Sequence, residues 1–342
     1  MESIVRGIFA AWGKILAGRH PNLSIEITRE CPLRCAGCYA YGEDHLGGGT
    51  VLRDVRDLRG ERLVQGVLRL LRRTKPIHVS LVGGEPLVRY RELNELLPRM
   101  AAMGIHTQLV TSAVRPIPLE WASLRRFQLV VSVDGLQPEH DARRAPATYE
   151  RVLKHIAGHQ VTVHCTVTRQ MVQRKGYLRE FMRFWSRLPE TKRIWVSLYT
   201  PQHGEISAER LLPEDRQQVV KDLLELREAF PKLETAKGLL GVYAKPPQSP
   251  SDCVFAKTTQ CLSPDLSSRI EPCQLGGKPV CNECGCIASA GLKAIGRHKL
   301  PGGLPVGSVF DASLRLGALV RWLREPAGQR QRPKKTLPVL QE

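Results

Sequence analysis

Residues 24–38 read SIEITRECPLRCAGC, a short β-rich run followed at once by cysteines at positions 31, 35 and 38. The alternation over Ser24–Thr28 predicts a strand, so the three thiols are expected in a loop at the carboxyl end of that strand. Active-site residues of α/β barrels gather at this end. Given one cysteine, two more at set offsets arise by chance on the order of 10⁻³ at this composition, so the spacing indicates a function.

Three thiolates at this spacing suit two kinds of metal site. A four-iron cluster held by Cys31, Cys35 and Cys38 would keep one iron without a protein thiolate, and an open iron can bind a further ligand. A structural zinc site would need a fourth ligand from elsewhere in the chain. The spacing by itself leaves both open.

A second motif follows the next β-rich run. Residues 77–82 lead directly into Gly83-Gly84-Glu85-Pro86. Paired glycines let the backbone approach a ligand closely, and a carboxylate can accept hydrogen bonds from an ammonium group. Alone, this motif could be an ordinary turn before a helix. Beside the cysteine loop it indicates a ligand site.

The segment 24–200 alternates β-rich runs with amphipathic stretches, which is typical of repeated βα units around a parallel sheet. The six expected strands are Ser24–Thr28, Ile77–Val82, Thr107–Thr111, Leu129–Val133, Val161–Thr168 and Ile194–Tyr199. The expected helices include Glu61–Arg73, Tyr149–His159 and Pro213–Phe230. The predicted fold class is α/β, a partial (β/α)6 TIM-like barrel with a small C-terminal cysteine-rich segment.

Four regions are predicted along the chain. Residues 1–23 form an amphipathic leader helix, which is neither a convincing signal peptide nor long enough to span a bilayer. Residues 24–243 form the barrel and residues 244–310 the cysteine-rich segment, with a boundary in the Pro-, Ser- and Lys-rich stretch Ala244–Ser251. Residues 311–342 are expected to hold a C-terminal helix and a basic tail.

The three motifs together resemble the radical S-adenosylmethionine (SAM) superfamily: the CxxxCxxC loop, the GGEP turn, and Ser132-Val-Asp134-Gly135 at the end of the fourth strand. Residues 132–156, SVDGLQPEHDARRAPATYERVLKHI, further resemble its branch with SPASM or Twitch auxiliary-cluster domains. The resemblance implies a [4Fe-4S] cluster that cleaves SAM reductively to a 5′-deoxyadenosyl radical. It also implies an oxygen-sensitive enzyme and a low-potential electron donor of the ferredoxin or flavodoxin type.

The resemblance also suggests roles for single residues. The open iron would bind the amino and carboxylate groups of SAM, the GGEP turn would hold its ammonium, and Ser132 and Asp134 would lie near its ribose. Weaker candidates for contacts with SAM are Thr111, Ser112, Thr166, Thr168 and Arg144. His140 and Asp141 match a recurrent pair of the auxiliary-cluster branch, although a capping role at a helix start is an equally simple interpretation.

The chain departs from the superfamily at one position. The residue before the third cysteine is often aromatic in this superfamily, but here it is Gly37. Part of the role of that position toward adenine belongs to the backbone, so glycine can serve. Tyr39 is the candidate for the missing ring.

Six further cysteines lie within residues 253–286, and Cys281-Asn-Glu-Cys284 is the kind of tight pair from which metal sites start. We predict one auxiliary [4Fe-4S] cluster, in an arrangement closer to a Twitch than to a full SPASM domain. The predicted ligands are Cys261, Cys273, Cys281 and Cys284, with Cys253 and Cys286 as alternates. A zinc knuckle or a set of disulfides are the alternatives. Cys165, alone in an alternating strand, is predicted to be a buried core thiol.

The charge balance favours an anionic partner, because 51 Lys and Arg residues stand against 33 Asp and Glu, a net charge of +18. Only 6% of residues are aromatic, too few for a platform that stacks single-stranded bases, so no nucleic acid is expected. The clustered cysteines suit metal ligation in a reducing cytoplasm rather than a secreted disulfide scaffold.

Three functions remain open at this stage. Radical SAM enzymes with auxiliary clusters largely modify peptides or proteins, so the resemblance favours a peptide substrate. The amphipathic stretch Ser3–Leu16, with Arg6 and Lys14 on its polar side, would suit peripheral membrane contact and a lipid substrate; the first forty residues are weakly similar to the radical SAM enzyme that adenosylates hopanoid lipids. The alternative for this stretch is a helix that caps the barrel. An iron–sulfur electron carrier is the third possibility, although it has no need of the GGEP turn.

Overall fold

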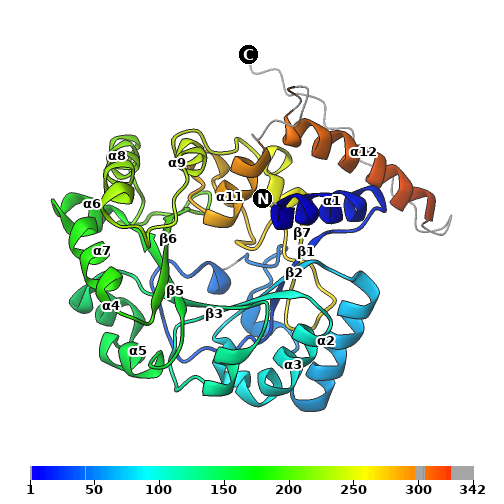
Figure 1. Cartoon of the computed structure of the whole chain (residues 1–342), viewed down its shortest axis with the longest axis horizontal. Helices are drawn as coiled ribbons and strands as arrows, with labels where there is room; N and C mark the ends of the chain where they lie inside the picture. The colour runs from blue at the N-terminus through cyan, green and yellow to red at the C-terminus, as the bar shows by residue number, and fades with distance from the viewer. Residues whose placement is uncertain (1, 43, 297–302, 304, 325–342) are drawn as a thin grey trace.

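The computed structural model describes residues 2–42, 44–296, 303 and 305–324. Its centre is a seven-stranded parallel sheet with the order β6-β5-β4-β3-β2-β1-β7, curved into a partial barrel (Figure 1). The strands are β1 (Asn22–Glu26), β2 (His78–Val82), β3 (His106–Thr111), β4 (Phe127–Ser132), β5 (Val161–Val167), β6 (Thr191–Leu198) and β7 (Thr259–Leu262). The predicted fold class and all six predicted strands are confirmed, with ends that differ by at most three residues.

Helices cover the outside of the curved sheet (Figure 1). They are α1 (Glu2–Leu16), α2 (Gly60–Thr74), α3 (Tyr90–Ala102), α4 (Gln137–Arg144), α5 (Tyr149–His155), α6 (Arg169–Gln173), α7 (Tyr177–Arg187), α8 (Pro213–Ala229), α9 (Lys237–Ala244), α10 (Val254–Thr258), α11 (Ile287–Gly296) and α12 (Val306–Arg324). The three helices named from the sequence are all present. The helix predicted to end at His159 stops four residues earlier, and Gly158 then adopts a positive φ of 79°.

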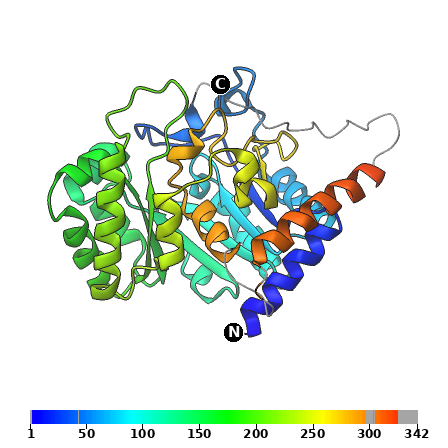
Figure 2. The ribbon, with the colours of Figure 1, turned by 90° about the horizontal axis from the view of Figure 1, so that it is seen from above.

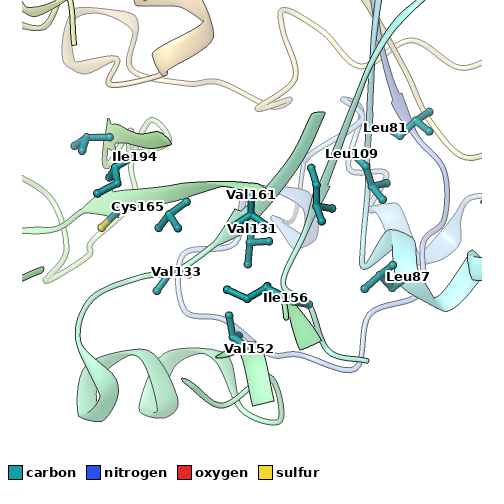
Figure 3. Close-up of a cluster of buried hydrophobic side chains, with 14 of the residues drawn as sticks. Leu81, Leu87, Leu109, Val131, Val133, Val152, Ile156, Val161, Cys165 and Ile194 are labelled. Atoms are coloured by element: carbon teal, nitrogen blue, oxygen red, sulfur yellow. The ribbon is translucent and has the colours of Figure 1, made fainter. Parts of the chain in front are cut away.

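The main core lies between the outer face of the sheet and these helices. Successive strand residues point to opposite faces, so alternate apolar side chains of each strand meet the helices. Figure 3 shows this for Val131 and Val161 of neighbouring strands with Val152 of α5, all three fully buried. Each such side chain contributes about 1.5–3 kcal/mol to stability through burial. Cys165 belongs to the same cluster and is 1% exposed, which confirms the predicted core thiol.

The seventh strand was not predicted. Thr259–Leu262 has only four residues, too few to show an alternating pattern, and it lies inside the expected cysteine-rich segment. It pairs in parallel with β1, with Ser24 opposite Cys261. The sheet therefore continues into this segment, and the pairing brings Cys261 next to the strand that leads into the three-cysteine loop.

The leader helix α1 packs against α12 (Figures 1 and 2). The Trp12 indole donates a hydrogen bond to the Ser313 hydroxyl. Gly317 allows the two backbones to approach, because a β-carbon there would lie 2.0 Å from the Ile15 carbonyl oxygen. Across the described ranges, no helix is both long and apolar enough to cross a bilayer. The predicted basic tail lies outside the described residues.

Candidate active site

Backbone hydrogen bonds join the three-cysteine loop to the GGEP turn at the carboxyl ends of β1 and β2. The Gly84 N–H donates to the Thr28 carbonyl at 2.9 Å, and the Glu85 N–H donates to the Glu30 carbonyl at 2.8 Å. A β-carbon at Gly84 would lie 2.2 Å from the Glu30 oxygen. Only glycine permits this approach, which gives a physical reason for the glycine in the motif.

The thiols of Cys31, Cys35 and Cys38 are partly buried in this loop. Burial, with the nearby negative charges of Glu85 and the other two sulfurs, raises the pKa of Cys31 to about 12, and burial likewise raises the pKa of Cys38. Three neighbouring thiols on one loop are the donor set that a four-iron cluster with one open iron requires.

Glu85 is 1% exposed and already has several partners. One carboxylate oxygen accepts hydrogen bonds from the Leu87 N–H at 2.9 Å and from the Thr111 hydroxyl, and the other accepts from the Ser112 N–H at 2.8 Å. Burial raises the pKa of Glu85, and these hydrogen bonds oppose that shift. The carboxylate therefore ties the GGEP turn to the end of β3. Pro86 begins the short 3₁₀ helix that follows.

Asp134, just past the end of β4, is the anchor for two arginines. Its Oδ2 accepts hydrogen bonds from the Arg143 Nε at 2.9 Å and the Arg144 Nε at 2.8 Å, and its Oδ1 accepts from the Thr166 N–H at 3.3 Å. Burial alone would raise the pKa of Asp134, but the two guanidinium groups lower it to about 2. This carboxylate is ionised and its oxygens are occupied.

Arg144 stands at the centre of the predicted contacts. Its Nη1 donates to the Ser112 hydroxyl at 2.9 Å, and its side chain is only 16% exposed. Although burial alone would lower the pKa of this guanidinium, the negative charges of Asp134, Cys35 and Cys38 raise it. Arg144 is therefore the cation best placed to meet a carboxylate bound near the cysteine loop.

The remaining polar candidates lie on the ends of β4 and β5. Ser132 is 9% exposed, and Thr168 is the residue before α6. His164 of β5 was not singled out from the sequence. Its Nε2 lies 2.8 Å from the Ser197 hydroxyl of β6, on the inner face of the barrel. An alternating strand places one residue in two on that face, which is the signal that could have found it.

His140 and Asp141 hold local structure. The His140 Nδ1 accepts a hydrogen bond from the Asp134 N–H at 3.2 Å, and its Nε2 lies 2.8 Å from the Ala147 carbonyl. Burial lowers the pKa of His140, so its ring is neutral and Nε2 donates. The Asp141 carboxylate accepts from the Tyr149 N–H at 2.6 Å, at the start of α5. For Asp141, the capping role at a helix start therefore explains the contact better than a direct role in the active site does.

A tyrosine does lie beside Gly37, but it comes from another strand. A β-carbon on Gly37, whose φ is +60°, would lie 2.6 Å from the Tyr199 hydroxyl oxygen. Tyr199 follows β6, 4% exposed. Tyr39, the ring expected from the sequence, instead stacks toward His45 with 5.8 Å between ring centres. Sequence proximity favoured Tyr39, and only the curvature of the sheet brings Tyr199 to this place.

Five of the six later cysteines line one small cavity at the same mouth of the barrel: Cys253, Cys273, Cys281, Cys284 and Cys286. The open space inside it is about 30 Å³. Cys261, on β7 and 4% exposed, is not in this lining, although it packs in one buried cluster with Cys253 and Cys273. The Gln274 amide donates to the Cys286 sulfur at 3.3 Å, and Cys253 Sγ lies 3.2 Å from the Ser289 hydroxyl. Several thiols around one cavity are the donor set that an iron–sulfur cluster requires.

The end of β6 holds this cysteine segment. A β-carbon at Gly285 would lie 2.1 Å from the Leu198 carbonyl oxygen. The Leu198 N–H donates to the Gly285 carbonyl at 2.9 Å, and the Gly285 N–H donates to the Thr200 hydroxyl at 2.9 Å. Arg216 of α8 donates to the Cys284 carbonyl at 3.2 Å. The segment is thus fastened to the mouth of the barrel between its two outer strands.

A buried pair connects the two cysteine groups. Glu26, at the end of β1, is 1% exposed, and its Oε1 lies 2.7 Å from the His45 Nε2. The His45 Nδ1 lies 3.3 Å from the Leu275 carbonyl, in the loop after Cys273. One side chain from the first loop therefore bridges the barrel and the second cysteine group.

Comparison with known proteins agrees with this geometry. Residues 25–172 match the radical SAM superfamily. These residues therefore form a radical SAM domain. It is 29% identical to the PqqA peptide cyclase of Rhizobium meliloti (strain 1021) over 271 residues, 72% of this chain and 66% of that protein. It is 32% identical over 102 residues to the 7-carboxy-7-deazaguanine synthase of Hyperthermus butylicus, 30% of this chain and 39% of that one.

Among solved structures, Streptococcus suis SuiB bound to its precursor peptide SuiA has the same fold. The TM-score is 0.54 and the identity 20%, over 76% of this chain and 62% of SuiB. The chain thus spans just under two thirds, or less, of the length of these three proteins. The predicted radical SAM domain is confirmed, and with it the use of SAM and a [4Fe-4S] cluster.

Proposed function

We propose that this radical SAM enzyme modifies a peptide or protein, with the first cysteine loop generating the radical and the second cysteine group assisting. The observation that carries the proposal is the backbone-bonded assembly of the CxxxCxxC loop and the GGEP turn. Its neighbours are the Asp134–Arg144 pair and a cavity lined by five thiols, all at one mouth of the barrel. The likeness to the PqqA peptide cyclase supports the substrate class.

In this proposal Cys31, Cys35 and Cys38 hold the [4Fe-4S] cluster. With SAM bound, that group supplies an electron that breaks a carbon–sulfur bond, giving methionine and a 5′-deoxyadenosyl radical that removes a hydrogen atom from substrate. The loop keeps the three thiols half-buried, so the polypeptide excludes water from the reacting atoms.

The barrel ends orient SAM. The Gly83–Gly84 backbone and Glu85 stand where an ammonium can be held, and Arg144 offers its guanidinium to a carboxylate. Asp134 and Ser112 hold that guanidinium, and the Thr166 N–H holds Asp134 in turn, while Ser132 at the end of β4 is the residue we assign to the ribose side. Tyr199 beside Gly37, rather than Tyr39, is the ring we assign to the adenine side.

The second group holds an auxiliary [4Fe-4S] cluster. Its ligands come from the five thiols that line the cavity, of which Cys273, Cys281 and Cys284 were predicted. Because Cys261 lies on β7 outside that lining, we now favour Cys253 or Cys286 as the fourth ligand. The auxiliary cluster would take up an electron after hydrogen abstraction, which would make the net reaction an oxidation of the substrate.

The first experiment measures radical initiation. Anaerobic protein reconstituted with iron and sulfide, then given SAM and dithionite, should form 5′-deoxyadenosine, and the Cys38→Ala variant should form none. A Cys165→Ala variant is the matched control, because its thiol lies in the core. Equal product from wild-type and Cys38→Ala protein would contradict the assignment.

The second experiment separates the ligand sets. Cys261→Ser and Cys286→Ser variants are compared by iron content and electron paramagnetic resonance of the reduced protein. We expect Cys286→Ser to lose or alter the auxiliary signal and Cys261→Ser to keep it. The reverse result would restore the set predicted from the sequence.

A further inference from the structure

A cationic cavity lies at the opposite end of the sheet from the cysteines. It has a volume of about 450 Å³ and opens to solvent between the first residues of β6 and the segment that follows α8. Four cations line it, together with one carboxylate and one hydroxyl: Lys192, Arg193, Arg227, Lys232, Glu234 and Thr235. The cavity is therefore a separate place from the radical site.

Most of this positive charge has no counter-ion. Glu234 lies 3.4 Å from Arg193 and so compensates that guanidinium. The Lys232 ammonium donates to a neutral carbonyl, that of Leu188, at 2.8 Å. Lys192 has no hydrogen-bond or ion-pair partner within the part of the chain that the structure describes. Among the described residues, Arg227 makes one long ion pair, 3.8 Å, with the exposed Glu228. Three of the four cations of the lining therefore have no carboxylate closer than 3.8 Å within the described part of the chain.

The wall of the cavity is part of the regular fold. The Ile194 N–H donates to the Lys232 carbonyl at 2.7 Å, and the Glu234 N–H donates to the Ile194 carbonyl at 3.0 Å. This short parallel pairing adds the segment to the edge of β6. The cations are thus carried on ordered backbone, and little ordering entropy would be lost when an anion binds.

We propose that this cavity binds an acidic segment of the peptide substrate. The inference rests on the proposed function, which supplies the peptide. The cavity is far larger than one small ion needs, and the cations that line it come from two chain segments. Several carboxylates of one peptide therefore fit the cavity better than a single ion does. Binding at a remote site raises the effective concentration of the rest of the peptide at the radical site.

The test uses the full-length reconstituted protein and a fluorescein-labelled hexaglutamate peptide, followed by fluorescence anisotropy at low and at physiological ionic strength. The Lys192→Gln/Arg227→Gln double variant should bind the peptide at least about tenfold more weakly than wild type. The matched control is Arg69→Gln/Arg72→Gln, which removes the same charge from exposed positions of α2. It should bind within about twofold of wild type.

Two results would overturn the inference. Equal loss in both double variants would mean that the peptide responds to net charge alone. Uptake of inorganic phosphate that is abolished by Lys192→Gln/Arg227→Gln, with no site-dependent peptide binding, would assign the cavity to a phosphate ligand instead. SAM cleavage by the wild-type protein without substrate is measured in parallel. If the wild-type protein forms no 5′-deoxyadenosine, the proposed function is contradicted, whereas the cavity is judged by peptide binding alone.

A second variant covers the case in which the double variant does not fold. Lys192→Gln changes one exposed side chain of the lining, so the melting temperature should not change. Peptide binding should weaken about threefold, since one cation near the carboxylates is lost. Unchanged peptide binding in a folded Lys192→Gln protein would overturn the assigned pocket.

Discussion

The loop of Cys31–Cys38 and the segment of Cys253–Cys286 reach the same mouth of the barrel, but they are held there by different means. The first loop continues directly from β1 and is bonded to the adjoining β2 turn. The second comes from far along the chain and is attached at two places. Its own strand β7 pairs with β1 at one edge of the sheet, and Gly285 lies against Leu198 at the end of β6, the other edge strand. Local connection places the first group, and tertiary contacts place the second.

This difference predicts that the two groups fail separately. The strand that carries the first loop, β1, is buried and paired on both sides, with β2 and β7, whereas the attachment of the second group depends on a few close contacts at the edge strands. A change at one attachment should therefore disturb one cysteine group and leave the other working. Each of the following variants tests that separation.

The largest effect is expected from Gly84→Ala. Its β-carbon would overlap the Glu30 carbonyl, 2.2 Å away, so the loop and the GGEP turn must separate. We expect a loss of about 3 kcal/mol in unfolding free energy, and roughly a 100-fold loss of 5′-deoxyadenosine formation because the reacting groups are misplaced. Denaturant melts and product assays measure both. Gly13→Ala, with open space around its β-carbon, is the control.

Gly285→Ala should disturb the second group and spare the first. Its β-carbon would lie 2.1 Å from the Leu198 carbonyl, so the segment around Cys284 must leave the end of β6. We expect the iron content of reconstituted protein to fall by about half while SAM cleavage stays within about threefold of wild type. Gly291→Ala in α11, where nothing lies within 4 Å, should change neither. Loss of SAM cleavage together with the loss of iron in Gly285→Ala would show that the two cysteine groups are not independent.

The bridge between the groups should have a smaller effect. His45→Ala leaves the buried Glu26 carboxyl without its partner, and we expect a loss of about 2 kcal/mol in unfolding free energy. Glu26→Gln in the same background should recover part of it, so the two changes are expected to be non-additive by about 1 kcal/mol. Urea unfolding of the four proteins in this cycle measures the coupling, and strict additivity would mean that the pair does not act as one unit.

The smallest effect is expected within the first site alone. Arg144→Lys keeps the charge but loses the planar group that reaches both Asp134 and Ser112. We expect the KM for SAM to rise about tenfold, which corresponds to about 1.4 kcal/mol, with the second group unaffected. Arg151→Lys on the exposed face of α5 provides the comparison. A KM within twofold of wild type would remove Arg144 from the SAM contacts.

Sequence reasoning reached furthest where chemistry depends on residues close together in the chain. The cysteine spacing and the GGEP turn each mark a site within a few residues, and the β-rich runs gave the six barrel strands. Sequence reasoning did not predict Tyr199, His45 or β7. Each of these acts through a partner that is distant in the sequence, and a four-residue strand has too little pattern to stand out.

By itself the sequence determined the alternation of strands and helices, the three-thiol loop and the glycines that allow close backbone contact, because periodicity and local spacing are written along the chain. Tertiary structure alone decided which tyrosine lies beside Gly37, which thiols share the second cavity, and that Lys192 and Arg227 face the same space. Those relations come from the curvature and edge pairing of the sheet, which bring together residues that no local pattern connects.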